Sequence, residues 1–339
     1  MAIVLHGPRE IERARRAGQV AAHTLATVLA RLCPGITTAQ IDRWVRSDTA
    51  ARGARPSQLG YHGFPAAVCT SRNHVVCHGM PSEDERLEDG DIINVDVTSE
   101  LDGFHGDTSA TVAIGTPPPA AAHVLEVARR CRDAGVAVVR DGARLGDVGA
   151  AIEATAEAAG CAVVREWGGH GIGRQMHMEP HVSYVGPAGR GQRLRAGMMF
   201  TVEPMITIGR PGVRTLDDGW TVVTADGSPS AQFEHTVLVT ERGYEVLTVV
   251  RARNPSAFRA IRGCRSRPAT ATSPGLLRRK GIEHYQVRPV LRLLDVLREH
   301  PAGRDLLDQR RVRGRRDLIH GRGEGLLQRR RQRLVQQRP

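Results

Sequence analysis

The sequence predicts an α+β fold in which helices cover an antiparallel sheet. The first observation is a hairpin pattern: an alternating run over residues 91–97 is followed by the turn signal Asp102-Gly103 and by a second strand-like run over residues 104–114. The second observation is that two stretches with apolar residues at helical spacing precede strand-like runs in each half of the chain. Strands joined by a tight turn pair antiparallel, which gives the expected sheet its direction.

Four helices are expected from this pattern. Proline suits the first helical turn, so the first helix is expected to begin at Pro8, and Pro34-Gly35 follows its end. A threonine hydroxyl can accept a hydrogen bond from a free N–H group at a helix start, so Thr37 or Thr38 is expected to cap the second helix. The expected helices are residues 8–32, the capped helix with Ile41, Trp44 and Val45, and residues 120–139 and 145–159.

Strand-like runs occur in both halves, and a glycine-rich tight loop is expected at residues 168–171. Successive side chains on a strand point to opposite faces, so Asp96 shares a face with Asn94 and Thr98. Across the hairpin, Asp96 and Asp107 are expected to lie side by side. The halves share this plan without obvious sequence identity. The expected strands are residues 66–71, 74–79, 91–97, 104–114, 198–205, 219–223 and 233–239.

Charge divides the 339-residue chain into two parts. Residues 251–339 contain 24 basic and 7 acidic residues, a net charge of +17. The other 24 basic and 29 acidic residues give residues 1–250 a net charge of −5, within a total of +12. The sequence therefore predicts one folded domain over residues 1–250 and an arginine-rich extension over residues 251–339. The extension is expected to be largely disordered, because it is rich in charge and poor in aromatic residues.

Cysteine usage and hydropathy indicate a compartment. The six cysteines form no Cys-X-X-Cys pair, which favours reduced thiols in a cytosolic protein. The first residues carry charges too early for a secretory signal, and no apolar run approaches the roughly 20 residues that span a membrane. We therefore expect a cytoplasmic protein with no membrane partner. The absence of heptads favours a monomer.

Five polar residues stand in unfavourable contexts. Four carboxylates occur in strand-like apolar runs and one histidine in the glycine-rich loop; they are Asp96, Asp107, His170, Glu203 and Glu234. A lone buried carboxylate costs several kcal/mol unless it is compensated. Four carboxylates carry −4, which two divalent cations would balance, and oxygen ligands with one imidazole suit such ions. The alternative for each residue alone is an exposed strand position or a surface salt bridge.

The motifs around these residues resemble a known family. Residues 1–250 are similar along their whole length to the type I methionine aminopeptidases of bacterial form. The motifs that carry the resemblance are GYHGFPAAVCTSRNHVVCHGMP, DGDIINVDVT, DGFHGDTSATV, GGHGIGRQMHMEP, LRAGMMFTVEPM and SAQFEHTVLVT. The resemblance implies a pseudo-symmetric α/β "pita-bread" fold with a dinuclear metal site. Its metals would be Co²⁺, Mn²⁺, Fe²⁺ or Zn²⁺, and its substrates the N-termini of nascent polypeptides.

The resemblance also implies a role for each residue of the site. Asp107 and Glu234 would bridge the two ions, Asp96 would chelate one of them, and His170 and Glu203 would bind the other. The bridging hydroxide would attack the first peptide bond, with Glu203 as the proton shuttle. His177 would stabilise the carbonyl oxygen, and His78 would hydrogen-bond the scissile amide. The implied methionine pocket includes Tyr61, His62, Phe64, Cys69, Met176 and Trp220.

Two positions depart from the pattern of the family, and the resemblance implies one further site. Met176 stands where many relatives have an aromatic pocket residue, and Met178 where an acidic residue is common. Both bear on the breadth of substrate preference and not on the reaction. A monovalent-cation site of the family would lie near Asn73, Val75 and Ser230.

Three related classes of protein fit the sequence less well. Prolidases and aminopeptidase P have a large extra N-terminal domain, for which Asp96 comes too early. Type II methionine aminopeptidases insert a helical subdomain between the last two glutamates, but Glu203 and Glu234 are only 31 residues apart. A pita-bread binding module without catalysis should lack the ligands. For the extension, the alternatives are a ribosome or rRNA anchor through its arginines, a disordered tail, or a stretch read through from a GC-rich gene.

Overall fold

The computed structural model describes residues 3–250, and the extension lies outside the described residues. Its four α-helices agree with the expected ones to within a few residues. The first ends at Leu29 and not at Leu32, because the N–H groups of Arg31 and Leu32 bond to carbonyls three residues back in a tighter turn. Thr37 is the cap of the second helix and accepts the Gln40 N–H. The helices are α1 Pro8–Leu29, α2 Thr38–Ala51, α3 Pro119–Ala137 and α4 Leu145–Glu157.

Within residues 3–250, the strands form four small sheets in which every pairing is antiparallel, as expected. One sheet joins β1, β4 and β2, with β5 paired to β4; the largest runs in the order β15-β14-β9-β7-β8. Two three-stranded sheets, β13-β10-β6 and β11-β12-β3, complete the set. The strands are β1 Arg55–Pro56, β2 Cys69–Arg72, β3 Val75–Cys77, β4 Ile92–Leu101, β5 Phe104–Ala113, β6 Ala162–Val163, β7 Gly169–Gly171, β8 Met178–Val182, β9 Met199–Val202, β10 Met205–Thr207, β11 Val213–Thr215, β12 Val222–Thr224, β13 Ser230–Gln232, β14 His235–Thr240 and β15 Gly243–Val246.

The β4–β5 hairpin has the predicted turn. Asp102 and Gly103 both have positive φ, 53° and 75°, as a two-residue type I′ turn requires. The register pairs Asp107 with Thr98 and Asp96 with Ser109. The two aspartates therefore share a face as diagonal neighbours, two residues out of step, and their carboxyl groups interact, so the expectation that they lie side by side across the hairpin is confirmed.

Three expectations about strands are corrected. His170 is not in a tight loop but in β7, an inner strand of the largest sheet. The expected strand 198–205 is two strands, β9 and β10, interrupted at Glu203-Pro204, where proline lacks the N–H that a ladder needs. The expected strand 233–239 begins only at His235, so Glu234 lies in a break between β13 and β14.

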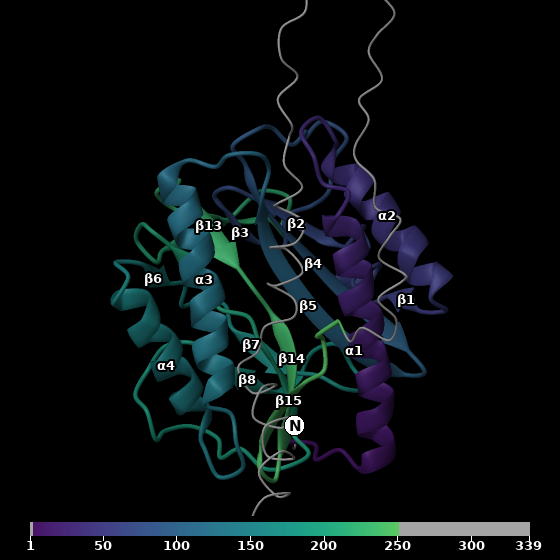
Figure 1. The fold of residues 1–339 in the computed structure, drawn as a ribbon, viewed down its shortest axis with the longest axis vertical. Helices are drawn as coiled ribbons and strands as arrows, with labels where there is room; N and C mark the ends of the chain where they lie inside the picture. Colours follow the sequence, from purple (N-terminus) through teal and green to yellow (C-terminus); the bar gives the residue numbers. More distant parts are fainter. Residues whose placement is uncertain (1–2, 251–339) are drawn as a thin grey trace, which may run out of the picture. The chain divides into compact units, whose positions relative to one another are not determined.

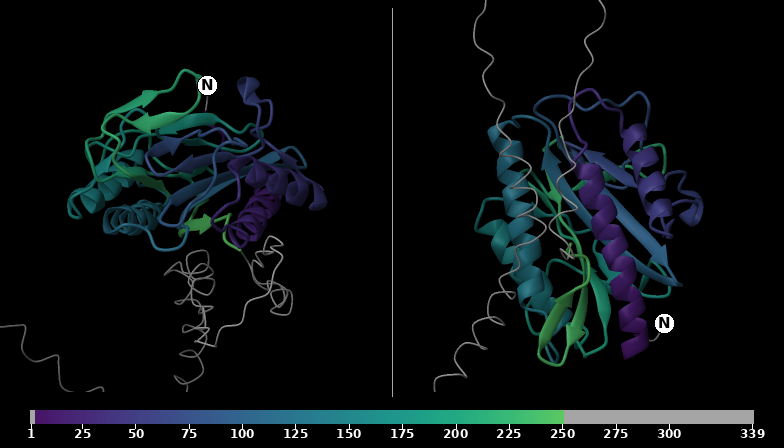
Figure 2. Two further views of the ribbon diagram at one scale, coloured as in Figure 1. Left: turned by 90° about the horizontal axis from the view of Figure 1, so that it is seen from above. Right: turned by 45° about the vertical axis from the view of Figure 1, so that its right-hand side comes forward.

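Helices and strands form layers (Figures 1 and 2). Seen from above, the helices lie along one side of the strands, with α1 and α2 over the strands of the first half and α3 and α4 over those of the second. The apolar core lies between these layers and includes Leu25 and Val28 of α1 with Val95 and Val97 of β4, all without exposure to solvent.

Helix α1 crosses β5 at a pair of glycines. A Cβ atom built on Gly106 would lie 2.4 Å from the Cα and N atoms of Gly18, closer than real Cβ atoms approach backbone. Because this contact is backbone to backbone, no side chain can rotate to relieve it. Glycine at position 106 therefore lets helix and strand approach closely, directly beside Asp107.

Gly106→Ala should destabilise the protein by about 1–3 kcal/mol, because overpacking forces the helix away from the strand. The midpoint and slope of urea unfolding would measure this change. The matched control is Gly212→Ala, where the added Cβ would meet only the Ala225 Cβ at 3.9 Å. Equal stability of the two variants would contradict the prediction.

Candidate metal centre

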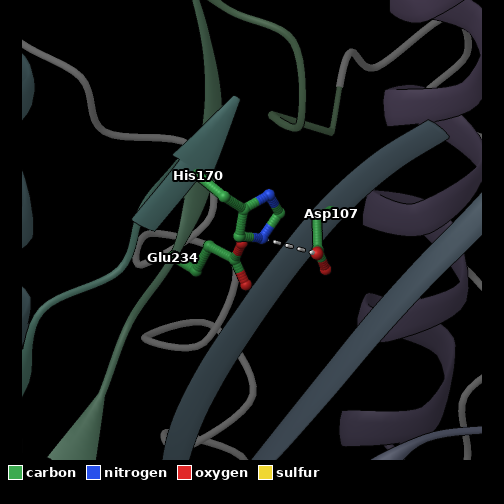
Figure 3. Close-up of side chains that lie close together, drawn as sticks. All are labelled: Asp107, His170 and Glu234. Carbon is green, nitrogen blue, oxygen red and sulfur yellow. Dashed lines mark ion pairs between the residues drawn. The ribbon is translucent and has the colours of Figure 1, made fainter. Parts of the chain in front are cut away.

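The five polar residues singled out in the sequence come together at one point. Asp96 and Asp107 come from β4 and β5, His170 from β7, and the two glutamates from the breaks after β9 and before β14. One ligand atom from each of Asp107, His170 and Glu234 lies within 4.8 Å of the others, and Figure 3 shows these side chains converging. The His170 Nε2 atom is 3.8 Å from Asp107 Oδ2 and 3.5 Å from Glu203 Oε1.

Hydrogen bonds orient these side chains. The Thr98 hydroxyl donates to Asp107 Oδ1 at 2.7 Å, and the Thr201 hydroxyl donates to Glu203 Oε1 at 2.6 Å. The Gln232 amide donates to Glu203 Oε2 at 3.0 Å. These three supporting residues were missed at the sequence level. Thr98 could have been found, since it shares the polar face of β4, but Thr201 and Gln232 carried no local signal.

The tautomer of His170 follows from its neighbours. Its Nδ1 atom is 3.1 Å from the Gly171 carbonyl oxygen, which can only accept, so Nδ1 carries the proton. The Nε2 lone pair then faces the carboxylates of Asp107 and Glu203. A neutral imidazole held in this way, with its other nitrogen fixed by a carbonyl, is the arrangement of a metal-ligating histidine.

Burial shifts the acid–base behaviour of the whole cluster. Desolvation raises the pKa of Asp107 to about 6, against hydrogen bonds that lower it. Desolvation likewise raises the pKa of Glu203 to about 8. Burial, with repulsion from the neighbouring carboxylates, raises the pKa values of Asp96 and Glu234 well above their ordinary range. Burial lowers the pKa of His170 to about 3, which leaves its lone pair free.

Two buried oxygen atoms of the cluster have no hydrogen-bond partner within residues 3–250: Asp96 Oδ1 and Glu234 Oε1. An unsatisfied buried carboxylate oxygen is costly unless a cation compensates it. The donor set of carboxylate oxygens and one imidazole nitrogen suits divalent cations. The residues present therefore fit a divalent metal site.

A cavity of about 480 Å³ opens onto this cluster. Four of the five polar residues line it; Glu234 does not, because it is almost completely buried. The predicted pocket residues Tyr61, His62, Phe64, Cys69, Met176 and Trp220 all line the same cavity, together with His78 and His177. Further lining residues that sequence reasoning missed include Gln58, Trp167, His181 and Thr215.

The two histidines of the cavity are held by aromatic neighbours. His177 Nδ1 is 2.8 Å from the Tyr61 hydroxyl oxygen, and its ring centroid is 4.1 Å from that of His170. His78 has a φ of 55° and packs perpendicular to the Trp167 ring, with centroids 4.9 Å apart. Burial lowers the pKa values of both histidines, that of His177 to about 4. Both are therefore neutral at physiological pH.

The positions suggested for a monovalent cation are also neighbours. The Asn73 carbonyl oxygen accepts the Ser230 N–H at 2.9 Å, and Val75 begins β3 two residues further on. The Asn73 side chain accepts the Ile92 N–H and donates to Asp91. The polar groups of Asn73 are thus engaged within the protein.

Comparison with known proteins identifies the family. The model of metallopeptidase family M24 matches residues 12–241. The chain belongs to this family. Methionine aminopeptidase A of Synechocystis sp. is 49% identical over 247 residues, which cover 73% of this chain and 98% of that protein. Methionine aminopeptidase of Salmonella typhimurium is 45% identical over 251 residues, 74% of this chain and 95% of that protein.

Solved structures agree with this assignment. Methionine aminopeptidase from Rickettsia prowazekii superposes with a TM-score of 0.72 at 43% identity, covering 73% of this chain and all of that one. The prolidase from Pyrococcus furiosus gives a TM-score of 0.60 at 20% identity, covering 72% of this chain and 65% of that one, which shows a shared fold alone. The predicted pita-bread fold is confirmed. Within residues 3–250, the helices are too short or too polar to cross a bilayer.

The metal-free M24 protein should lose stability as the pH rises from about 6.5 to about 8. Because the folded-state pKa of Glu203 is raised to about 8, its neutral form stabilises the fold at low pH, and this stabilisation is lost as the pH rises through that value. The lowered pKa of His170, about 3, has the opposite sign, but its contribution is complete above its ordinary pKa of 6.5. Five further histidines with pKa values lowered by burial have the same sign as His170, so the contribution of Glu203 is the difference in slope between the wild type and a variant without this carboxyl; these histidines are His6, His23, His78, His105 and His177.

Thermal unfolding in EDTA across this pH range would measure the effect. The midpoint should fall with pH, and added Mn²⁺ should restore it more strongly at the higher pH. Glu203→Gln is the internal control, because an amide cannot titrate and its slope should be smaller. A wild-type midpoint that falls no more steeply between about pH 6.5 and 8 than that of Glu203→Gln would contradict the prediction.

Proposed function

We propose that this protein removes the N-terminal methionine from nascent proteins whose second residue is small. The observation that carries the proposal is the cavity, in which an apolar pocket adjoins a cluster of four carboxylates, three of them buried, and one neutral histidine. The relatives at 45–49% identity bear the name methionine aminopeptidase and span the same domain. An aminopeptidase needs one group for the substrate's amine and another for the reacting carbonyl, and this cavity offers both.

The proposed ligands are the five clustered residues. Asp107 and Glu234 would bridge two ions, Asp96 would bind one, and His170 and Glu203 the other; Co²⁺, Mn²⁺, Fe²⁺ and Zn²⁺ all suit this donor set. When bound, such ions polarise a carbonyl and lower the pKa of water. A monovalent cation near Asn73, Val75 and Ser230 is a further proposal from the family.

Glu203 is proposed to move the proton. Its Oε1 atom is held by the Thr201 hydroxyl and its Oε2 atom by the Gln232 amide, so its orientation is fixed. From this position it takes a proton from the attacking water and returns it to the leaving amine. A general base of this kind works best when it is rigidly aimed at the reacting atoms.

His177 is proposed to stabilise the carbonyl oxygen as charge develops. For this its Nε2 atom must carry a proton, so the Tyr61 hydroxyl donates to Nδ1 across the 2.8 Å contact. Burial keeps the ring neutral, so it acts as a hydrogen-bond donor and not as an acid. His78, steadied against Trp167, would bond the scissile amide.

The methionine side chain is proposed to bind against Phe64, Cys69 and Trp220. The Phe64 and Trp220 rings pack edge to face, with centroids 5.1 Å apart, and Cys69 is buried beside them. Burial raises the pKa of the Cys69 thiol well above its ordinary value, so it presents a neutral surface. Sulfur–aromatic contacts favour a thioether in such a pocket. Met176 completes the wall and makes it softer than an aromatic residue would.

Methionine release from Met-Ala-Ser should require a divalent metal. The metal-stripped protein should be inactive, and Mn²⁺ or Co²⁺ should restore activity, with two ions bound per chain by elemental analysis. Glu203→Gln should lower kcat by about 10²–10⁴-fold, because it removes the proton carrier. Glu241→Gln, an exposed glutamate in the turn before β15, is the matched control. Metal-independent activity, or none with any ion, would rule out the proposed function.

The arginine-rich extension, residues 251–339, is proposed to contact the ribosome. Its net charge of +17 would attract RNA phosphates, and nascent chains emerge there. We further propose that the enzyme is monomeric and cytoplasmic. Full-length protein should co-sediment with ribosomes at low salt more strongly than residues 1–250 alone, and the difference should vanish at high salt. Equal binding would leave the extension without this role.

A further inference from the structure

The loop between β7 and β8, residues 172–177, is called the site loop here because it carries Met176 and His177 into the cavity. It has little internal structure: the Gly173 N–H donates to the Gln175 carbonyl at 3.1 Å. The position of His177 is therefore set by the contact of its ring with the Tyr61 hydroxyl and by what the site loop rests on.

One support lies beneath Gly173. Its carbonyl oxygen accepts the His105 N–H at 2.8 Å. A Cβ atom at this position would lie 2.7 Å from His6 Cε1 and 2.9 Å from His6 Nε2, so the backbone of the loop lies directly on the imidazole. His6 itself is buried, and its N–H donates to the Gly197 carbonyl at 2.8 Å. The segment before α1 thus forms a floor for the site loop.

The second support is the side chain of Arg174. Its Nη2 and Nε atoms donate to Glu10 Oε1 at 2.9 and 3.1 Å, and its guanidinium lies 5.0 Å from the centroid of Phe104, which is fully buried. The other oxygen of Glu10 accepts the Gly7 N–H at 3.3 Å and lies 3.4 Å from His6 Nδ1. Glu10 therefore joins the helix start, the floor and the site loop.

We propose that Arg174 is a positioning residue for His177, holding the site loop against the first turn of α1. Arg174 precedes His177 by three residues, and its contacts fix the loop on the side away from the cavity. The Arg174 side chain is 60% exposed and Glu10 is 29% exposed, and such pairs contribute little to global stability. Their consequence is local, on the direction of a catalytic ring. This inference rests on the role proposed above for His177.

Arg174→Met tests the inference, because it keeps an apolar stem over Phe104 but removes the bond to Glu10. We expect kcat for Met-Ala-Ser to fall between about tenfold and a hundredfold, since a displacement of about 1 Å in a catalytic group can cost that much. KM should change little, because His177 acts on charge that develops in the transition state. Hydrogen exchange in the peptide that spans residues 172–178 should become faster.

Three comparisons separate positioning from general damage. Arg16→Met removes an ion pair of the same helix, with Asp102 at 2.8 Å, that does not touch the site loop; its kcat and loop exchange should stay at wild-type values. Arg174→Lys, which keeps the charge without the planar fork, should recover part of the rate. The double variant Arg174→Glu with Glu10→Arg, which exchanges the two charges, should have a higher kcat than Arg174→Glu alone.

The outcomes are distinct. The inference would be overturned if hydrogen exchange of the site loop in Arg174→Met kept its wild-type rate. It would also be overturned if Arg16→Met lost as much kcat as Arg174→Met. A fall in kcat/KM carried entirely by KM would overturn it as well. Loop exchange is measured without any substrate. A protein with no methionine release would therefore refute the proposed function, while the exchange data would still decide whether Arg174 holds the site loop.

Discussion

The organising constraint of this protein is the cost of holding four carboxylates together out of water. Desolvation is the largest influence on the pKa of each, and mutual repulsion adds to it for Asp96 and Glu234. Hydrogen bonds from Thr98, Thr201 and Gln232 offset only part of this cost, and two carboxylate oxygen atoms have no partner among the described residues. A cluster in this state favours binding of a cation, and the neutral His170 beside it presents a nitrogen lone pair to the same point.

The backbone reaches this arrangement by interrupting its own regular structure. Glu203 follows a strand that a proline ends, and Glu234 lies in a break between two strands. Glycines on either side of His170 allow β7 to approach its neighbours, since a Cβ on Gly171 would lie 2.1 Å from the Glu179 carbonyl oxygen. Ligands at such breaks can turn toward a common point, which residues alternating along an unbroken strand could not all do.

Much of this was predictable from sequence, for definable reasons. The helices and the β4–β5 hairpin follow local rules of periodicity and turn chemistry, and they were found with small errors at their ends. The diagonal offset of Asp96 and Asp107 follows from the predicted turn, because a two-residue turn at Asp102-Gly103 pairs Thr98 with Asp107. Sequence could not show that His170 lies in a strand, since glycine-rich segments look like loops until their neighbours are known. The contacts of Arg174 with Glu10, 164 residues away, carried no sequence signal at all.

The five polar residues come from both halves of the domain, and this has a mechanical consequence. Asp96 and Asp107 belong to the first half of the domain, and His170, Glu203 and Glu234 to the second. Any ion that they hold joins the halves as a cross-link would, at the place where their charges would otherwise push them apart. Because a ligand that binds only the folded state stabilises it in proportion to the logarithm of its free concentration, metal supply sets resistance to unfolding as well as activity. Starvation for metal would then shorten the lifetime of the chain before it limited turnover.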